Sequence, residues 1–204
     1  NAISLTARTG DMTQTAGRLA AARLAADAAG EVRLEAANNA LAAVTGRAGT
    51  AFRVRTAGDL RADGVTAPEI ALTSGGTISQ SAALDTSLLS VDAAASANLS
   101  AADNAIRALA AIRAPGGLTL RTSTDLLLTV PVSVPSASLT ASGGITQMPG
   151  APLSTGALRL SAGGAITLED GANAITRLLG ADATGDIRIV TGTALALNGP
   201  ISTS

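Results

Sequence analysis

The sequence predicts an all-β protein that folds as a parallel β-solenoid, a chain wound in stacked coils. Three observations lead to this class. One long phrase occurs three times along the 204 residues, a shorter beat of about 21 residues runs within the copies, and short segments alternate apolar and polar residues. Repeats of this length are typical of solenoids, in which each coil packs only on its neighbours.

The long phrase covers the whole chain. It begins as "ISLTARTGDMTQ" at Ile3, "IALTSGGTISQ" at Ile70 and "ASLTASGGITQ" at Ala137. We therefore predict one continuous solenoid over residues 1–204, with long repeats at roughly 1–68, 69–135 and 136–204 and forming part of a longer array. Equivalent positions recur at Leu5, Leu72 and Leu139, at Gln14, Gln80 and Gln147, and at Asn39, Asn104 and Asn173.

The shorter beat sets the expected coil at about 20 to 23 residues, so that three coils make one long repeat. Segments such as "FRVRT" at Phe52 and "LTLRT" at Leu118 alternate apolar and polar residues, which indicates strands with one buried face. The beat itself is visible in Ile145, Ile166 and Ile187, with steps of 21, and in Ile78, Leu99 and Leu118, with steps of 21 and 19.

One segment of the chain has the composition of a helix. Residues 17–44 are rich in Ala, Leu, Arg and Glu and, taken alone, favour a helix, but the equivalent part of the third copy reads as strands. We therefore predict strands there.

Glycine pairs beginning at Gly75, Gly116, Gly143 and Gly163 precede strands, where we expect turns that need positive φ.

The composition excludes several classes of function. The chain is 47% apolar, yet Phe52 is its only aromatic residue, so the interior must be narrow and filled by aliphatic side chains. Cys and His are absent, which removes disulfides, the usual zinc sites and Ser-His-Asp catalysis. All 14 basic residues are Arg against 15 acids, a balance that argues against a nucleic-acid partner. The apolar runs are too short to span a membrane.

The candidate polar residues give no catalytic, cofactor or metal site. If a long repeat spans three coils, equivalent residues lie about 14 Å apart and cannot bond to each other. We therefore expect each Asn to hold a tight bend or cap a turn, and each Gln to satisfy local backbone groups. No acid recurs across the three copies: we expect Glu169 and Asp170 to point to opposite faces of a strand, and Asp182 and Asp186 to lie in a turn. The threonine pairs Thr13/Thr15 and Thr122/Thr124 do not return on successive coils.

The phrases "GGITQ", "ALRLSAGGAITLEDGANAI" and "GDIRIVTGTALAL" resemble the repeat region of filamentous haemagglutinin-like exoproteins. These are bacterial surface proteins of the two-partner secretion type. The resemblance covers essentially the whole chain, and it implies a right-handed parallel β-helix, export from a Gram-negative cell, and a role as a stalk, fibre or adhesive surface. The amino-terminal secretion domain typical of that family does not occur in these 204 residues.

The sequence therefore favours a non-enzymatic, extracellular structural segment of a surface adhesin or fibre, without a cofactor. Neither end of the chain resembles a solenoid cap, so we expect neighbouring repeats or further copies to stack end to end. A host or neighbouring cell surface, or its glycans, is a further expected partner. The alternatives are a polysaccharide-cleaving β-helix enzyme, which needs converging acids, and a glycan-binding or ice-binding solenoid face, which needs a regular polar ladder.

Overall fold

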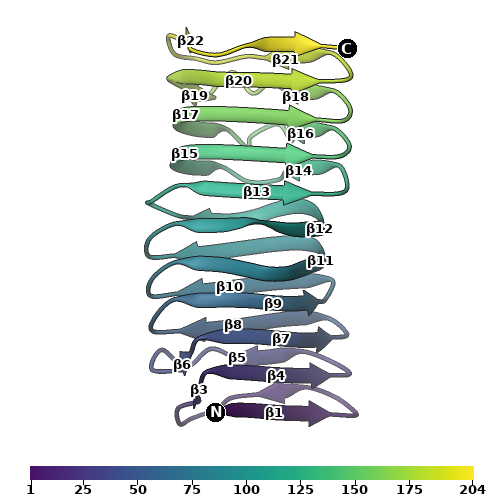
Figure 1. Ribbon diagram of the computed structural model, residues 1–204, viewed down its shortest axis with the longest axis vertical. Helices are drawn as coiled ribbons and strands as arrows, with labels where there is room; N and C mark the ends of the chain where they lie inside the picture. The colour runs from purple at the N-terminus through teal and green to yellow at the C-terminus, as the bar shows by residue number, and fades with distance from the viewer.

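The chain winds into a β-solenoid of about 10 turns. The computed structural model describes residues 1–101 and 103–204, and over these residues it contains strands and turns but no helix. From the N-terminus upward, the chain runs to the right along the front and to the left along the rear while it rises, which is a right-handed winding (Figure 1). The predicted fold class is confirmed.

Parallel strands stack on the front of the solenoid and form the front sheet. Each strand pairs with the one a coil earlier and the one a coil later, beginning with β1 on β4. The front sheet contains β1 (Ala2–Ala7), β4 (Arg23–Ala28), β7 (Ala43–Ala48), β9 (Leu60–Thr66), the first parts of β11 (Ile78–Ala93) and β12 (Ala97–Arg113), β13 (Leu118–Thr122), β15 (Val132–Ala141), β17 (Leu153–Ala162), β20 (Arg177–Ala183) and β23 (Ile201–Thr203).

A second stack of parallel strands forms the rear sheet. β11 and β12 run from the front sheet into the rear sheet without interruption, and the two stacks are therefore joined through continuous strands. The rear sheet contains β2 (Met12–Thr13), β5 (Val32–Leu34), β8 (Ala51–Thr56), β10 (Glu69–Ser74), the last parts of β11 and β12, β14 (Leu126–Leu128), β16 (Ile145–Gln147), β18 (Ile166–Leu168) and β21 (Ile187–Ile189).

Short strands line the left edge of the solenoid, where the chain returns from rear to front (Figure 1). They pair along the axis like the longer strands, for example β3 with β6 and β19 with β17. These edge strands are β3 (Ala20–Ala21), β6 (Ala40–Leu41), β19 (Ala174–Ile175) and β22 (Ala196–Leu197).

The strand register gives the length of each coil. Ile145, Ile166 and Ile187 are direct partners on successive coils, as the sequence predicted. Ile70 pairs directly with Phe52, so the coil that joins these two residues is shorter than the sequence predicted. The prediction for Leu99 was wrong: Ile78 pairs with Ala97, and Leu99 pairs instead with a residue of β13.

One long repeat spans three and a half coils, and the predicted three coils were wrong. Leu5 lies in β1 of the front sheet, Leu72 in β10 of the rear sheet, and Leu139 in β15 of the front sheet again. The shorter coils explain the extra half turn within each long repeat. Each repeat is therefore turned half a revolution from the previous one, and equivalent outward side chains appear alternately on the two sheets.

Residues 17–44 form strands, as predicted, despite their helical composition. They contain β3, β4, β5 and β6 and the start of β7. The local helical propensity is worth at most a few tenths of a kcal/mol per residue. β4 and β5 pair with the coil before and the coil after them, which offers their backbone N–H and C=O groups partners on both sides, and this tertiary gain decides the outcome.

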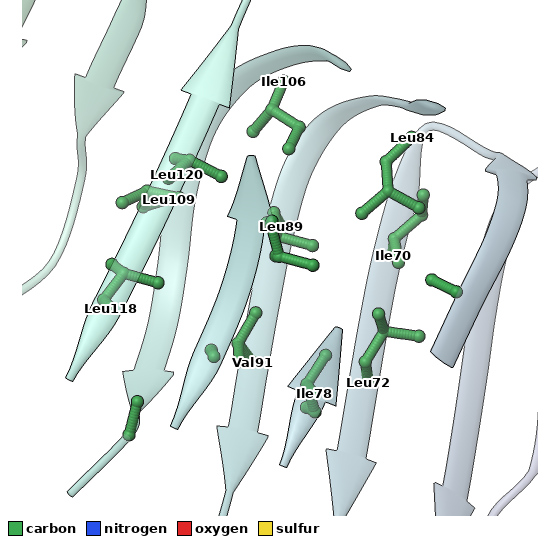
Figure 2. Packing of buried hydrophobic residues seen from close by; sticks show 14 of the residues in the cluster. Ile70, Leu72, Ile78, Leu84, Leu89, Val91, Ile106, Leu109, Leu118 and Leu120 are labelled. Carbon is green, nitrogen blue, oxygen red and sulfur yellow. The ribbon is translucent and has the colours of Figure 1, made fainter. Parts of the chain in front are cut away.

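The core is a narrow aliphatic shaft between the two sheets. The lone aromatic residue Phe52 is fully buried and lies in register between Val32 and Ile70. Figure 2 shows side chains such as Leu72 and Ile78 directed into this shaft. Because paired residues stack directly above one another, slim Leu, Ile, Val and Ala side chains form continuous apolar columns.

The glycine pairs mostly serve close packing, and the prediction of positive φ was wrong for Gly75, Gly143 and Gly163. In the pair that begins at Gly116, only the second residue, Gly117, has a positive φ, of 106°. A Cβ atom at Gly75 or Gly163 would collide with a backbone carbonyl of the coil below. These turns therefore require glycine because successive coils pass too closely for a side chain.

The half-coil offset can be measured with spin labels at the equivalent outward residues Thr6 and Thr140. Seven coil steps separate these residues on the front sheet, which corresponds to about 34 Å between backbones, whereas three coils per repeat would give about 29 Å. Pulsed electron paramagnetic resonance on the double-cysteine variant, made in this cysteine-free chain, measures the distance. Labels at the paired residues Thr140 and Ser161 serve as the short-distance control.

Candidate functional site

The recurring glutamine and asparagine residues meet in pairs at the corners of the solenoid. In the second repeat, Gln80 Nε2 donates to Asn104 Oδ1 at 2.8 Å, and Asn104 Nδ2 donates back to Gln80 Oε1 at 2.9 Å. Gln14 with Asn39 and Gln147 with Asn173 form the same reciprocal bonds, at 2.7 to 3.1 Å. We call these three pairs the corner amide pairs. Each joins a residue of one coil to a residue of the next.

Each asparagine also bonds the backbone around it in the same way. Asn104 Oδ1 accepts the N–H of Leu84 from the coil below at 2.8 Å, and its Nδ2 donates to the carbonyl of Leu99 at 2.9 Å. The matching contacts recur at the same sequence separations in the other two repeats. They join Asn39 to Leu19 and Leu34, and Asn173 to Leu153 and Leu168.

A threonine from the following coil completes every corner. Thr122 Oγ1 donates to the backbone carbonyl of Asn104 at 3.1 Å and accepts the N–H of Ile106 at 2.9 Å. Thr56 and Thr191 make the equivalent contacts in the first and third repeats. Three successive coils are therefore linked by side-chain hydrogen bonds once in every long repeat.

The asparagine of each corner is buried and hydrogen-bonded. Asn39, Asn104 and Asn173 each have a relative exposure of 0%, whereas Gln14 and Gln147 are half-buried. No buried side-chain nitrogen or oxygen in the described part of the chain lacks a partner. The neutral amides and the hydroxyl of a corner contain no titrating group and are engaged in these hydrogen bonds. The arrangement can position backbone, and its role is structural.

Equivalent residues do not bond to each other, and each Gln donates to a local backbone carbonyl, both as predicted. No residue other than glycine has a positive φ in the described chain, so the asparagines do not hold left-handed bends. The bond from each Gln to the next Asn was not predicted. A signal was present, because Gln precedes Asn by a nearly constant separation in all three copies. That separation is one coil plus a short corner.

The four acids considered as candidates do not come together. Glu169 pairs with Arg188, and Asp170 accepts backbone N–H groups from Gly150 and Ala172. Asp182 lies in β20, not in the predicted turn, and accepts a hydrogen bond from a serine of the top coil, whereas Asp186 lies in a turn as predicted. Glu169, Asp170 and Asp182 each make a side-chain contact with a neighbouring coil. No group of three acids suitable for a metal ion occurs among the described residues.

The threonine pairs do not form a flat ladder. Thr122 and Thr124 lie at a corner and bond to each other at 3.1 Å, and the same contact recurs only one long repeat later, between Thr191 and Thr193. Thr122 and Thr191 are also the threonines that complete the second and third corners. Their hydroxyls are thus engaged within the solenoid.

Asp63 has the most perturbed environment among the acids. Arg61 holds its carboxylate through two bonds, of 2.6 and 2.8 Å, Arg23 approaches at 3.2 Å from two coils below, and Ser81 donates from the coil above. The hydrogen bonds from Arg61 are the main cause that lowers the pKa of Asp63 to about 2, while partial burial opposes the shift. This cluster joins residues from three coils, β4, β9 and β11, on the outer surface of the front sheet.

Hollows on the surface are shallow. One of about 340 Å³ lies over the rear sheet where β12 bulges, between Ala71 and Ile112. Another, of about 540 Å³, follows the left edge and is lined by small residues and by hydroxyl groups, including those of Ser133 and Ser154. Neither of these two hollows contains a pair of acids. A third hollow, of about 400 Å³, is lined by the adjacent residues Glu169 and Asp170, whose carboxylates are engaged by Arg188 and by backbone N–H groups. The search for a helix able to cross the bilayer found none in the described part of the chain.

Replacing Asn104 by Ala tests the corner amide pairs. The change removes the Asn104 side chain from Gln80 Oε1, from the N–H of Leu84 and from the carbonyl of Leu99, so we expect a loss of about 3 kcal/mol in the free energy of unfolding. Urea unfolding followed by circular dichroism measures it. The exposed Asn98 of the same strand is the matched control, and Asn98→Ala should cost less than about 0.5 kcal/mol. Equal losses in the two variants would contradict the interpretation.

Asp63 predicts a specific acid sensitivity. Its pKa is depressed in the folded chain to about 2, so its stabilising contribution is complete above the unfolded value near 4 and is lost as the pH falls from there toward 2. Because solvent screens part of this interaction at the surface, we expect Asp63→Asn to remove roughly 1 to 2 kcal/mol of the stability difference between pH 7 and pH 2. Urea unfolding at both pH values measures this.

Comparison with known proteins supports the repeat character of the chain. The family described as "Repeats of unknown function (DUF5649)" matches residues 115–182, about a third of the chain. This range starts before β13, ends within β20 and includes the whole third corner amide pair, Gln147 with Asn173. No curated protein and no solved structure matches the chain. The chain is therefore similar to a known repeat family over one repeat length.

Proposed function

We propose that this chain is a structural repeat segment of an extracellular bacterial adhesin or fibre, of the filamentous haemagglutinin-like type. The observation that carries the proposal is the uninterrupted parallel pairing of the coils from β1 to β23 around one apolar shaft. A rod of about 10 turns built in this way is roughly 48 Å long. Bending it requires stretching hydrogen bonds along one whole face, so it is stiff.

The distribution of polar groups supports a mechanical role. The corner amides, the corner hydroxyls and the Asp63 cluster all link successive coils through hydrogen bonds. The side chains that carry chemistry are therefore used to hold one coil to the next. We propose that the segment is not an enzyme and that it serves to hold another part of the protein away from the cell.

The two ends of the solenoid support the proposed partners. The front strand β1 pairs only with the coil above it, and β23 only with the coil below it. In the top coil, Leu197 and Ile201 are exposed, although their column partners Leu178 and Ala181 are buried. Both surfaces have the backbone groups and apolar side chains that a further coil would cover. We propose that neighbouring repeats, or further copies, continue the stack there.

Immunogold electron microscopy of intact bacterial cells that carry the complete reading frame tests this proposal. With an antibody raised against the 204-residue solenoid, we expect gold along fibres outside the cell. A cytoplasmic protein detected in parallel with its own antibody should be labelled only after permeabilisation. Labelling of the solenoid only after permeabilisation would overturn the extracellular assignment, and labelling at the surface without fibres would overturn the stalk.

A further inference from the structure

The apolar columns do not by themselves determine how one coil stacks on the next. A shift of one residue would turn the buried face outward, but a shift of two residues keeps every apolar side chain inside. Ile78 pairs with Ala97, yet Leu99, two residues later, is equally apolar and has a relative exposure of 0%. The apolar pattern accepts either partner, and burial of the larger Leu opposite Ile78 would satisfy it equally well.

Backbone pairing also leaves freedom at this place. Along β11 and β12, the register shifts once between Ile78 and Asp85 and again between Leu89 and Val91. The two strands therefore absorb irregularities at two points without losing their parallel pairing. Some other interaction must determine which of the closely related registers is adopted.

The corner amide pair supplies that discrimination. A two-residue shift moves one strand about 6.6 Å along the other. The bonds between Gln80 and Asn104, at 2.8 and 2.9 Å, would break, and the N–H of Leu84 would lose its acceptor, Asn104 Oδ1. Asn104 is fully buried, so water could not replace these partners. A slipped register that the apolar columns tolerate is thus penalised at the corner.

We propose that the corner amide pairs fix the stacking register of the solenoid by excluding two-residue slips between coils. One pair occurs in every long repeat, and successive pairs lie on opposite edges, because Gln14 and Gln147 belong to the rear sheet and Gln80 to the front sheet. The stacking register is therefore fixed at one edge in one repeat and at the opposite edge in the next. Slips that begin in one repeat are stopped at the next pair and do not accumulate along the rod.

Engineered disulfides measure the register directly, since the chain contains no cysteine of its own. Asp85 and Ala105 are direct partners, so Asp85→Cys with Ala105→Cys reports the native register. Asp85→Cys with Arg107→Cys reports the slipped one, because those Cα atoms lie about 8 Å apart in native strands, beyond the reach of a disulfide. Both pairs remove the contact of Asp85 with Arg107 and are matched in that respect.

Each of the two cysteine pairs is introduced into the chain with the natural Gln80 and Asn104, and into the variant Gln80→Leu with Asn104→Leu. We expect the ratio of slipped to native disulfide, read by mass spectrometry after oxidation, to rise at least about tenfold in the variant. Gln14→Leu with Asn39→Leu is the matched control, because it makes the same change at a distant corner and should leave this ratio unchanged. An apolar variant that folds and keeps the natural ratio overturns the proposal.

A milder variant decides the question if the apolar pair does not fold by circular dichroism. Gln80→Met removes only the reciprocal partner of Asn104 and keeps the volume, while Asn104 retains its bonds to Leu84, Leu99 and Arg121. We expect a smaller rise of the same ratio, of about threefold. An unchanged ratio in this variant overturns the proposal as well.

Discussion

Each coil of this protein obtains its backbone hydrogen bonds from the coils before and after it. The rest of the structure follows from this hydrogen bonding between coils. Parallel strands at a spacing of about 4.8 Å bring the same part of successive coils into direct contact. The side chain that fits at a given position is therefore determined more by its partners one coil away than by its neighbours in sequence. This explains a core without large aromatic rings, in which Phe52 is the single exception and is enclosed by Val32 and Ile70.

The same constraint explains the glycines and the corners. Where the chain turns between sheets, successive coils pass so closely that a Cβ atom at Gly75 or Gly163 would meet a carbonyl of the neighbouring coil. Where a corner leaves backbone groups without strand partners, the amides of Gln80 and Asn104 and the hydroxyl of Thr122 supply them. Buried polar groups are tolerated here because, in the described part of the chain, all of their side-chain atoms are hydrogen-bonded.

The half-coil offset gives the rod two equivalent sides. An odd number of half turns per repeat places equivalent outward residues, such as Thr6 and Thr73, on the front and rear sheets in turn. Over a length of two repeats, the front sheet and the rear sheet therefore each present one copy of the equivalent outward residues. The alternation also places successive corner amide pairs on opposite edges of the solenoid.

Much of the fold was determined by the sequence itself, because apolar alternation and self-similarity reflect which side chains face the shaft. The strand structure of residues 17–44 and the partners of Ile145, Ile166 and Ile187 could be predicted for that reason. The partner of Ile78 could not, since Ala97 and Leu99 both suit an apolar column. Only the stacked coils decided this register and the three and a half coils per repeat, because the number of residues in a coil varies from turn to turn. The nearly constant Gln–Asn separation is visible in the sequence, but only the stacked coils show that the side chains of Gln80 and Asn104 meet, because that contact joins two different coils.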